Sequence, residues 1–163
     1  MALPCEWEAL AEQVSSEFVH GLFPSFRMPA FLACPDDQCA KAVFAGIARA
    51  AGARGVATEV IDLSQAPAQI LDGVTKRLCG FEGRSEWEEA PAVSVLVLDG
   101  FDRLEGAGHD GPIYPFRSKF QFDQDFLWLF IGRDWHRLRK LFGNYSLPLY
   151  HAASDLTHEP WRT

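Results

Sequence analysis

A carboxylate follows the most apolar stretch of the chain. The run Val95–Leu98 consists of four apolar residues, and Asp99 comes directly after it. A strand that ends in an acid holds the carboxylate rigidly at the edge of a sheet, where it can orient a hydrated magnesium ion beside the phosphates of a nucleotide. An aspartate in this place also caps the turn after many parallel strands. The spacing therefore leaves two interpretations of Asp99 open, a metal-orienting acid and a turn cap.

A lysine stands where a phosphate-binding loop would carry one. The stretch Pro35–Ala42 follows a short apolar run and aligns with the pattern G-x-x-x-x-G-K-[ST], in which Lys41 takes the place of the lysine. Proline and alanine replace the two glycines, and Ala42 has no hydroxyl with which to bind magnesium. Asp36 and Asp37 add negative charge where the phosphates would lie. The sequence therefore disfavours triphosphate binding and leaves a second interpretation of Lys41, a solvated helix residue.

A third candidate residue follows the apolar run Phe126–Ile131. Arg133 comes two residues after that run, where a basic side chain can sense a phosphate. The order of a strand, a loop with Lys41, a helix, two more strands, Asp99 and then Arg133 resembles the core of the AAA+ ATPases, or more broadly of the additional-strand P-loop NTPases. The resemblance spans residues 30–150. It implies nucleotide-binding roles for these three side chains in a degenerate site.

The chain lacks the residue that would activate water in this family. The resemblance implies a glutamate directly after the metal-orienting acid, because it polarises the attacking water. Gly100 occupies that position, and Asp102 lies two residues further on. Since a displacement of about 1 Å in a reacting group can cost about a hundredfold in rate, we expect a catalytically inactive pseudo-ATPase with no cofactor. ATP and magnesium are expected only if a partner subunit completes the site in trans.

These residues need a scaffold of alternating strands and helices. Apolar residues at three- and four-residue spacing predict helices, and short apolar runs bounded by proline or glycine predict strands. We expect strands over Ala30–Cys34, Ala57–Leu63, Val93–Leu98, Phe126–Ile131 and Ser146–Tyr150, and helices over Trp7–Leu22, Gln38–Ala51, Ala68–Leu78 and Trp135–Phe142.

Strands and helices in this order form right-handed crossovers and a parallel sheet. The predicted fold class is α/β, a three-layer sandwich with a mainly parallel five-stranded sheet, P-loop NTPase-like. Because such sheets bind ligands beyond the carboxyl ends of their strands, we expect the site in Pro35–Lys41, Asp99–Asp102 and Gly132–Asp134. The stretch Gly80–Ala90 is predicted to be a surface loop, and Gly100–Pro115 to be one long loop.

Length and charge limit the classes of partner. A chain of 163 residues is the size of one domain, with an N-terminal helix and linker over residues 1–26 and an α/β core over 27–163. The net charge of -7 opposes general attraction to nucleic acid or anionic lipid. No apolar run approaches the roughly 20 residues that cross a bilayer, and the first residues carry acids where a secretory signal carries Lys or Arg. We expect a cytoplasmic protein with no membrane partner.

The cysteines and histidines do not form a metal-binding pattern. Cys34 and Cys39 are the only close pair among the four cysteines, and no second pair follows that would complete four zinc ligands. The five histidines are scattered along the chain. We therefore expect no metal site and thiols in the reduced state.

One segment of this acidic chain is basic. In Arg133–Lys140 the predicted helix turns Trp135 inward and places His136, Arg137 and Lys140 outward. Such a surface suits an acidic partner protein or a phosphate backbone. The alternative is a solvated helix whose basic end complements its own dipole.

Aromatic residues follow the glycine-rich part of Gly106–Phe116. Tyr114 and Phe116 are candidates for an aromatic interface with a partner, or they cap the edge of the sheet. Taken together, the sequence predicts an inactive interaction or assembly module in a complex with another protein subunit. The alternatives are an NTPase subunit completed in trans, a nucleic-acid accessory factor that uses the basic segment, or a phage-defence factor, since small P-loop-like accessory proteins of bacterial phage-exclusion systems are of similar size.

Overall fold

The computed structural model describes residues 4–21, 29–78, 94–106, 110–123 and 125–162. A central sheet of five parallel strands has the order β2-β3-β4-β1-β5. The strands are β1 Ala30–Ala33, β2 Ala57–Asp62, β3 Ser94–Asp99, β4 Phe126–Gly132 and β5 Ser154–Asp155. The helices are α1 Pro4–Gly21, α2 Asp37–Gly52, α3 Pro67–Arg77, α4 Asp110–Phe120 and α5 Trp135–Gly143.

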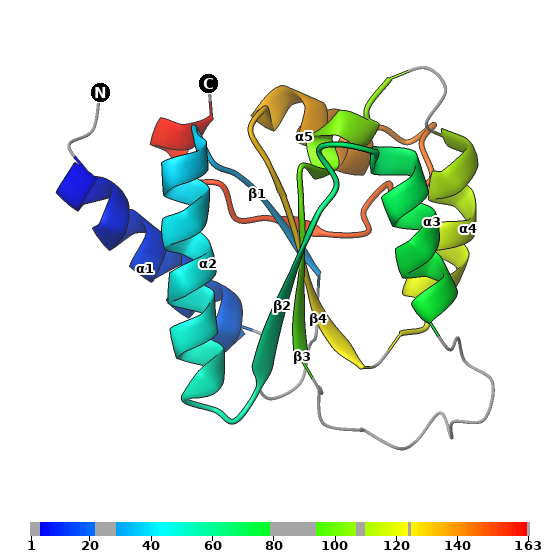
Figure 1. The fold of residues 1–163 in the computed structure, drawn as a ribbon. Coiled ribbons are helices and arrows are strands. Elements are labelled where there is room, and N and C mark those ends of the chain that lie inside the picture. The colour runs from blue at the N-terminus through cyan, green and yellow to red at the C-terminus, as the bar shows by residue number, and fades with distance from the viewer. Residues whose placement is uncertain (1–3, 22–28, 79–93, 107–109, 124, 163) are drawn as a thin grey trace.

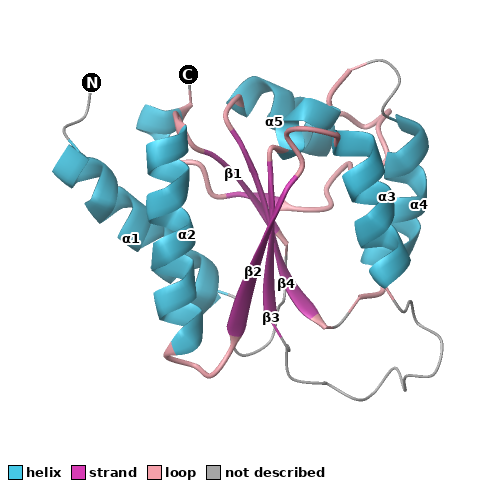
Figure 2. Ribbon diagram, in the orientation of Figure 1, coloured by secondary structure: helices cyan, strands magenta, loops and turns pink. Residues whose placement is uncertain are grey.

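Helices cover both faces of the sheet (Figure 1). Helices α1 and α2 lie on one face, and α3, α4 and α5 lie on the other. Colouring by secondary structure shows the strands as one layer between the two helical layers (Figure 2). The predicted three-layer α/β fold with a parallel five-stranded sheet is confirmed.

The alternation of side chains along the strands explains the two helical layers. In β4, Leu127 and Leu129 pack with the core under α1 and α2, whereas Trp128 and Phe130 pack with the core under α3, α4 and α5. Successive residues of a strand point to opposite faces, so an almost continuously apolar strand requires cover on both sides. This is why β4 lies inside the sheet, between β3 and β1.

The prediction of one long loop over Gly100–Pro115 is wrong. A short 3₁₀ helix spans Phe101–Leu104, and α4 begins at Asp110 and continues through Pro115. A proline inside a helix costs about 3 kcal/mol, but each large apolar side chain buried on the inner face of α4 contributes about 1.5–3 kcal/mol. The buried side chains on that face are Ile113, Phe116 and Phe120, and their burial outweighs the proline.

The prediction of a fifth strand over Ser146–Tyr150 is also wrong. The segment folds into successive turns, in which the N–H of Tyr150 bonds to the carbonyl of Leu147. Pro148 has no N–H to give to a strand ladder. The fifth strand is instead β5, which pairs with β1 through Ala30 opposite Ser154.

Two expectations concern residues outside those that the structure describes. These are the surface loop over Gly80–Ala90 and the linker after the first helix. Within the described ranges, no helix has both the length and the apolar character to cross a membrane.

Candidate functional site

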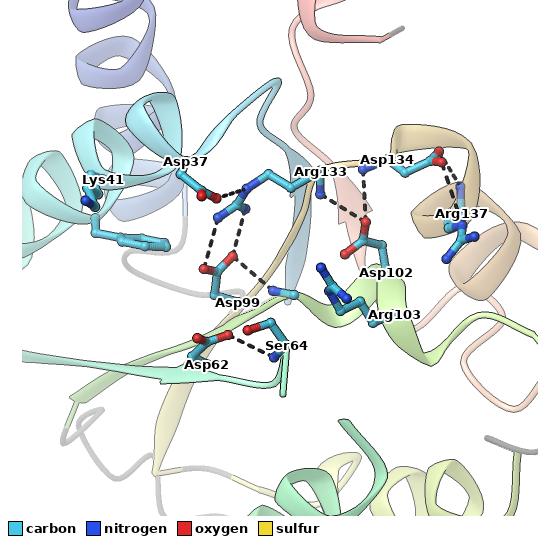
Figure 3. Close-up of a pocket in the computed structure, with 12 residues that line it drawn as sticks. Asp37, Lys41, Asp62, Ser64, Asp99, Asp102, Arg103, Arg133, Asp134 and Arg137 are labelled. Carbon is cyan, nitrogen blue, oxygen red and sulfur yellow. Dashed lines mark hydrogen bonds and ion pairs between the residues drawn. The ribbon is translucent and has the colours of Figure 1, made fainter. Parts of the chain in front are cut away.

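A pocket lies at the carboxyl edge of the sheet, where the predicted loops converge. Its volume is about 530 Å³. It is lined by Asp37, Lys41, Phe44, Asp62, Ser64, Asp99, Gly100, Asp102, Arg103, Arg133, Asp134 and Arg137. The three predicted nucleotide-site residues are thus brought to one pocket, from α2, β3 and the loop after β4 (Figure 3).

Arg133 and Asp99 form a two-pronged ion pair in this pocket. Nη1 of Arg133 lies 2.8 Å from Oδ1 of Asp99, and Nη2 lies 3.1 Å from Oδ2. Nε of Arg133 donates to Oδ1 of Asp37 at 2.9 Å. Only 14% of the Asp99 side chain and 30% of the Arg133 side chain are exposed. One guanidinium therefore joins α2 to the ends of β3 and β4, as Figure 3 shows.

The pKa of Arg133 reflects two opposing effects. Burial disfavours the charged guanidinium, but the hydrogen bonds and the charge of Asp99, with a further contribution from Asp37, raise the pKa above its ordinary value. Paired N–H donors in a planar fork match a carboxylate in both distance and direction. Arg133 is therefore held charged and fixed in orientation.

Asp99 has both carboxylate oxygens engaged. Besides Arg133, its Oδ1 accepts the backbone N–H of Gly100 at 2.9 Å. This bond to Gly100 is the one that the turn-cap interpretation of Asp99 predicts. A magnesium ion on this carboxylate would compete with the Arg133 guanidinium, because both cations bind the same two oxygens.

The residue after Asp99 cannot readily be a glutamate. Gly100 has φ +79°, a left-handed conformation that favours glycine. A Cβ at this position would also lie 3.2 Å from the backbone nitrogen of Ser64. The backbone that forms this turn therefore excludes the water-polarising side chain that the family resemblance implies.

The turn between β1 and α2 is short, and its last residue, Asp36, caps α2. Three residues, 34–36, separate Ala33 from the start of α2 at Asp37. The Asp36 carboxylate accepts the backbone N–H of Cys39 at 2.8 Å, and its carbonyl accepts that of Ala40 at 3.1 Å. An aspartate at a helix N-cap takes the N–H groups that could otherwise bind an anion. The predicted site segment Pro35–Lys41 therefore comprises this turn and the first residues of α2, which begins at Asp37, one residue before the predicted start of that helix.

Lys41 lies one turn into α2 and is exposed. It lines the pocket near Phe44. Among the described residues Lys41 forms no ion pair within 4.0 Å, so its charge faces the pocket and solvent.

Asp102 positions the loop that carries Arg133. Its side chain is 7% exposed, and its Oδ2 accepts the backbone N–H groups of Arg133 at 3.1 Å and Asp134 at 3.0 Å. Asp134 in turn caps α5 by accepting the N–H of Arg137 at 3.2 Å. Asp102 thus supports the backbone that carries the Arg133 guanidinium.

Four residues that line the pocket were not predicted from the sequence: Phe44, Asp62, Ser64 and Arg103. The backbone N–H and the hydroxyl of Ser64 bond to Asp62 and lower the pKa of that carboxyl. Asp62 ends a strand just as Asp99 does, and β2 pairs with β3 in register at these two residues. That shared position at the carboxyl edge was the signal that could have found Asp62.

Cys34 and Cys39 are buried between β1 and α2. The Cys34 thiol donates to the Cys39 sulfur, and this bond lowers the pKa of Cys39 and, together with burial, raises that of Cys34. Across the described ranges, no three Cys, His, Asp or Glu side chains are grouped as a metal site requires.

The predicted partner-binding residues of α5 differ in accessibility. His136, Arg137 and Lys140 are exposed, as expected. Trp135 is half-buried; its Nε1 donates to Asp155 at 3.0 Å, and its ring lies under the guanidinium groups of Arg139 and Arg162 at 5.1 and 5.4 Å. Trp135 therefore holds α5 against the C-terminal segment.

The two predicted aromatic contacts of α4 lie on opposite sides of the helix. Tyr114 is 59% exposed, whereas Phe116 is fully buried beside Phe120 and Trp128. Residues two apart in a helix point in nearly opposite directions. The expectation that Phe116 contributes to an exposed aromatic interface is wrong, because the ring fills the core.

Comparison of the sequence with models of protein families and with curated proteins gave no match.

Proposed function

We propose that the chain is a catalytically inactive P-loop NTPase-like domain that serves as an interaction or assembly module in a cytoplasmic complex with another protein subunit. The observation that carries this proposal is the ion pair of Arg133 with both oxygens of Asp99. The two side chains that a nucleotide site would use for metal and phosphate neutralise each other.

The topology supports the family part of the proposal. Strand β4 lies between β1, which leads to the turn before Lys41, and β3, which ends at Asp99. A strand inserted at this place is the feature for which the additional-strand class is named. The resemblance drawn from the order of residues therefore agrees with the order of the strands.

The local chemistry supports the absence of turnover. A three-residue turn leaves little backbone to surround a phosphate, and the Asp36 carboxylate already accepts the N–H of Cys39 in the first turn of α2. The left-handed Gly100 leaves no side chain to polarise water. The domain retains the scaffold of an enzyme whose metal-binding and phosphate-sensing side chains, Asp99 and Arg133, are bound to each other.

Calorimetric titration with ATP and magnesium tests the proposal. We expect any dissociation constant to be weaker than about 1 mM and no release of phosphate. The matched variant is Arg133→Met, which frees Asp99 without changing the turn before α2. Micromolar binding with hydrolysis that is lost in Lys41→Ala would overturn the proposal.

A second candidate function is an NTPase subunit completed in trans. The open pocket of about 530 Å³, with Lys41 and Arg103 exposed at its rim, favours it. The discriminating measurement is phosphate release after the chain is mixed with a subunit that co-purifies with it. Hydrolysis that appears only in the mixture supports the second function, and a stable complex without hydrolysis supports the first.

A further inference from the structure

A second hollow lies beside α5, and its lining residues differ from those of the pocket described above. Its volume is about 440 Å³. His136, Arg139, Lys140, Gly143, Asn144 and Tyr145 line it, and we name it the α5 groove. Arg139 and Lys140 give it two positive charges, and no carboxylate is among its described lining residues.

The charged groups that the α5 groove offers are hydrogen-bond donors, while the His136 ring and the Tyr145 hydroxyl can both donate and accept. Arginine and lysine donate hydrogen bonds and cannot accept them. The Oδ1 of Asn144 is already taken by the backbone N–H and the hydroxyl of Ser146, at 3.0 and 2.8 Å, which leaves the amide NH₂ of Asn144 for a ligand. A matching ligand must therefore be rich in acceptors and negatively charged.

The cations of the groove differ in how firmly they are held. Arg139 lies over the Trp135 ring at 5.1 Å, which limits the orientations of its guanidinium. Lys140 is 67% exposed, and its ion-pair partner Glu105 lies 3.6 Å away. The Glu105 side chain is 22% exposed, so a ligand carboxylate would share the Lys140 ammonium with Glu105 at the solvent side of this long pair.

An aromatic ring stands at the edge of the groove. Tyr145 is 85% exposed, the highest exposure among the large hydrophobic residues that the structure describes. It follows α5 by two residues, in a turn whose backbone is fixed by the Asn144 bonds. Exposed tyrosine beside arginine is a composition typical of interfaces between proteins.

We propose that the α5 groove binds a short acidic segment of the partner protein. This inference rests on the proposed function and names the surface and the chemistry that it would use. The complementary charge of the groove selects glutamate and aspartate side chains.

The distribution of charge favours a peptide over a nucleic acid. The chain carries a net charge of -7, and the five aspartates that line the pocket described above outnumber its four cations, Lys41, Arg103, Arg133 and Arg137. The charge of a polynucleotide extends beyond a groove of this size and would be repelled by the net negative charge of the chain, whereas the acids of a peptide can be confined to the groove.

Fluorescence anisotropy with two labelled probes tests the inference: a peptide of eight glutamates and an oligothymidylate of eight nucleotides. We expect the full chain to bind the peptide more tightly than the oligonucleotide. Arg139→Glu with Lys140→Glu should weaken peptide binding at least about tenfold. Tyr145→Ala, which changes no charge, should weaken it several-fold.

The matched control reverses two exposed lysines elsewhere, Lys76→Glu with Lys119→Glu, and carries the same change in net charge. Thermal unfolding checks that each variant folds. Three results would overturn the groove proposal. They are an equal loss of peptide affinity in the control, tighter binding of the oligonucleotide than of the peptide, and no binding of the peptide at all. If the Arg139→Glu, Lys140→Glu variant still forms the complex with a co-purifying subunit, the groove proposal is overturned and the proposed function stands. ATP hydrolysis by the unmodified chain alone overturns the proposed function.

Discussion

The Asp102 side chain lies against the α-carbon of Gly132, so closely that a Cβ on this glycine would come within 2.6 Å of Cγ of Asp102. Gly132 is the last residue of β4, and Asp102 accepts the two N–H groups that follow it. The glycine is therefore required by the carboxylate that supports the Arg133 loop.

Gly132→Ala is expected to destabilise the protein by about 1–3 kcal/mol, because the new methyl group must displace a buried carboxylate. Urea unfolding measures the change. The control is Gly73→Ala in α3, where no atom lies within 4 Å of the new Cβ, and a gain of about 0.5–1 kcal/mol is expected. Equal effects at the two glycines would contradict the close contact.

The Arg133 and Asp99 side chains should be energetically coupled. Arg133→Met and Asp99→Asn each leave a partly buried group without its partner, so the double variant should lose less stability than the sum of the single variants. We expect a coupling free energy of about 1–2 kcal/mol from urea unfolding of the four proteins. Additive losses would show that the pair contributes no net interaction.

Phe116→Ala and Tyr114→Ala separate the core from the surface of α4. Removing the buried Phe116 ring should cost about 3–5 kcal/mol. Removing the exposed Tyr114 ring should change stability by less than about 0.5 kcal/mol. Similar losses of stability in chemical unfolding would be inconsistent with the opposite orientations of the two rings.

The raised pKa of the Asp123 carboxyl leads us to expect that its contribution to stability falls as the pH rises. Burial raises its pKa, although the indole of Trp128 and the N–H of Phe126 donate to it at 2.9 and 3.0 Å. A carboxyl whose pKa is higher in the folded state contributes stability that is complete at low pH and is lost as the pH rises through the folded pKa. Asp123→Asn removes this dependence.

Relative to Asp123→Asn, the unmodified protein should therefore lose stability as the pH rises from the ordinary aspartate range towards neutrality. Urea unfolding of both proteins across this range measures the difference. A difference that grows in favour of the unmodified protein with rising pH would have the wrong sign.

The sequence predicted where the site would be but not which of its side chains bond to one another. Lys41, Asp99 and Arg133 reach one edge because Asp99 ends a parallel strand and the other two lie shortly after one. The ion pair of Arg133 with Asp99 depends on β4 being the neighbour of β3, and apolar patterns do not specify strand order. Pairing across a sheet is decided by packing of the whole core.

The sequence failed to predict α4 and β5 for a similar reason. Proline and glycine are local signals of loops, and they predicted that Gly100–Pro115 lacks a helix. The burial of Phe116 and Phe120 against Trp128 outweighs those signals, and the sequence does not reveal that contact in advance. Similarly, β5 is two residues long and leaves no periodic pattern to detect.

Arg133 bonds to residues 34 and 96 positions away along the chain. Contacts of such long range can form only when the strands that carry them are already assembled, so they belong to the last stage of folding. Truncation of Arg133 should then accelerate unfolding and leave the folding rate nearly unchanged in stopped-flow experiments. The ion pair that joins two sides of the pocket would thus help to determine how long the native state persists before it unfolds.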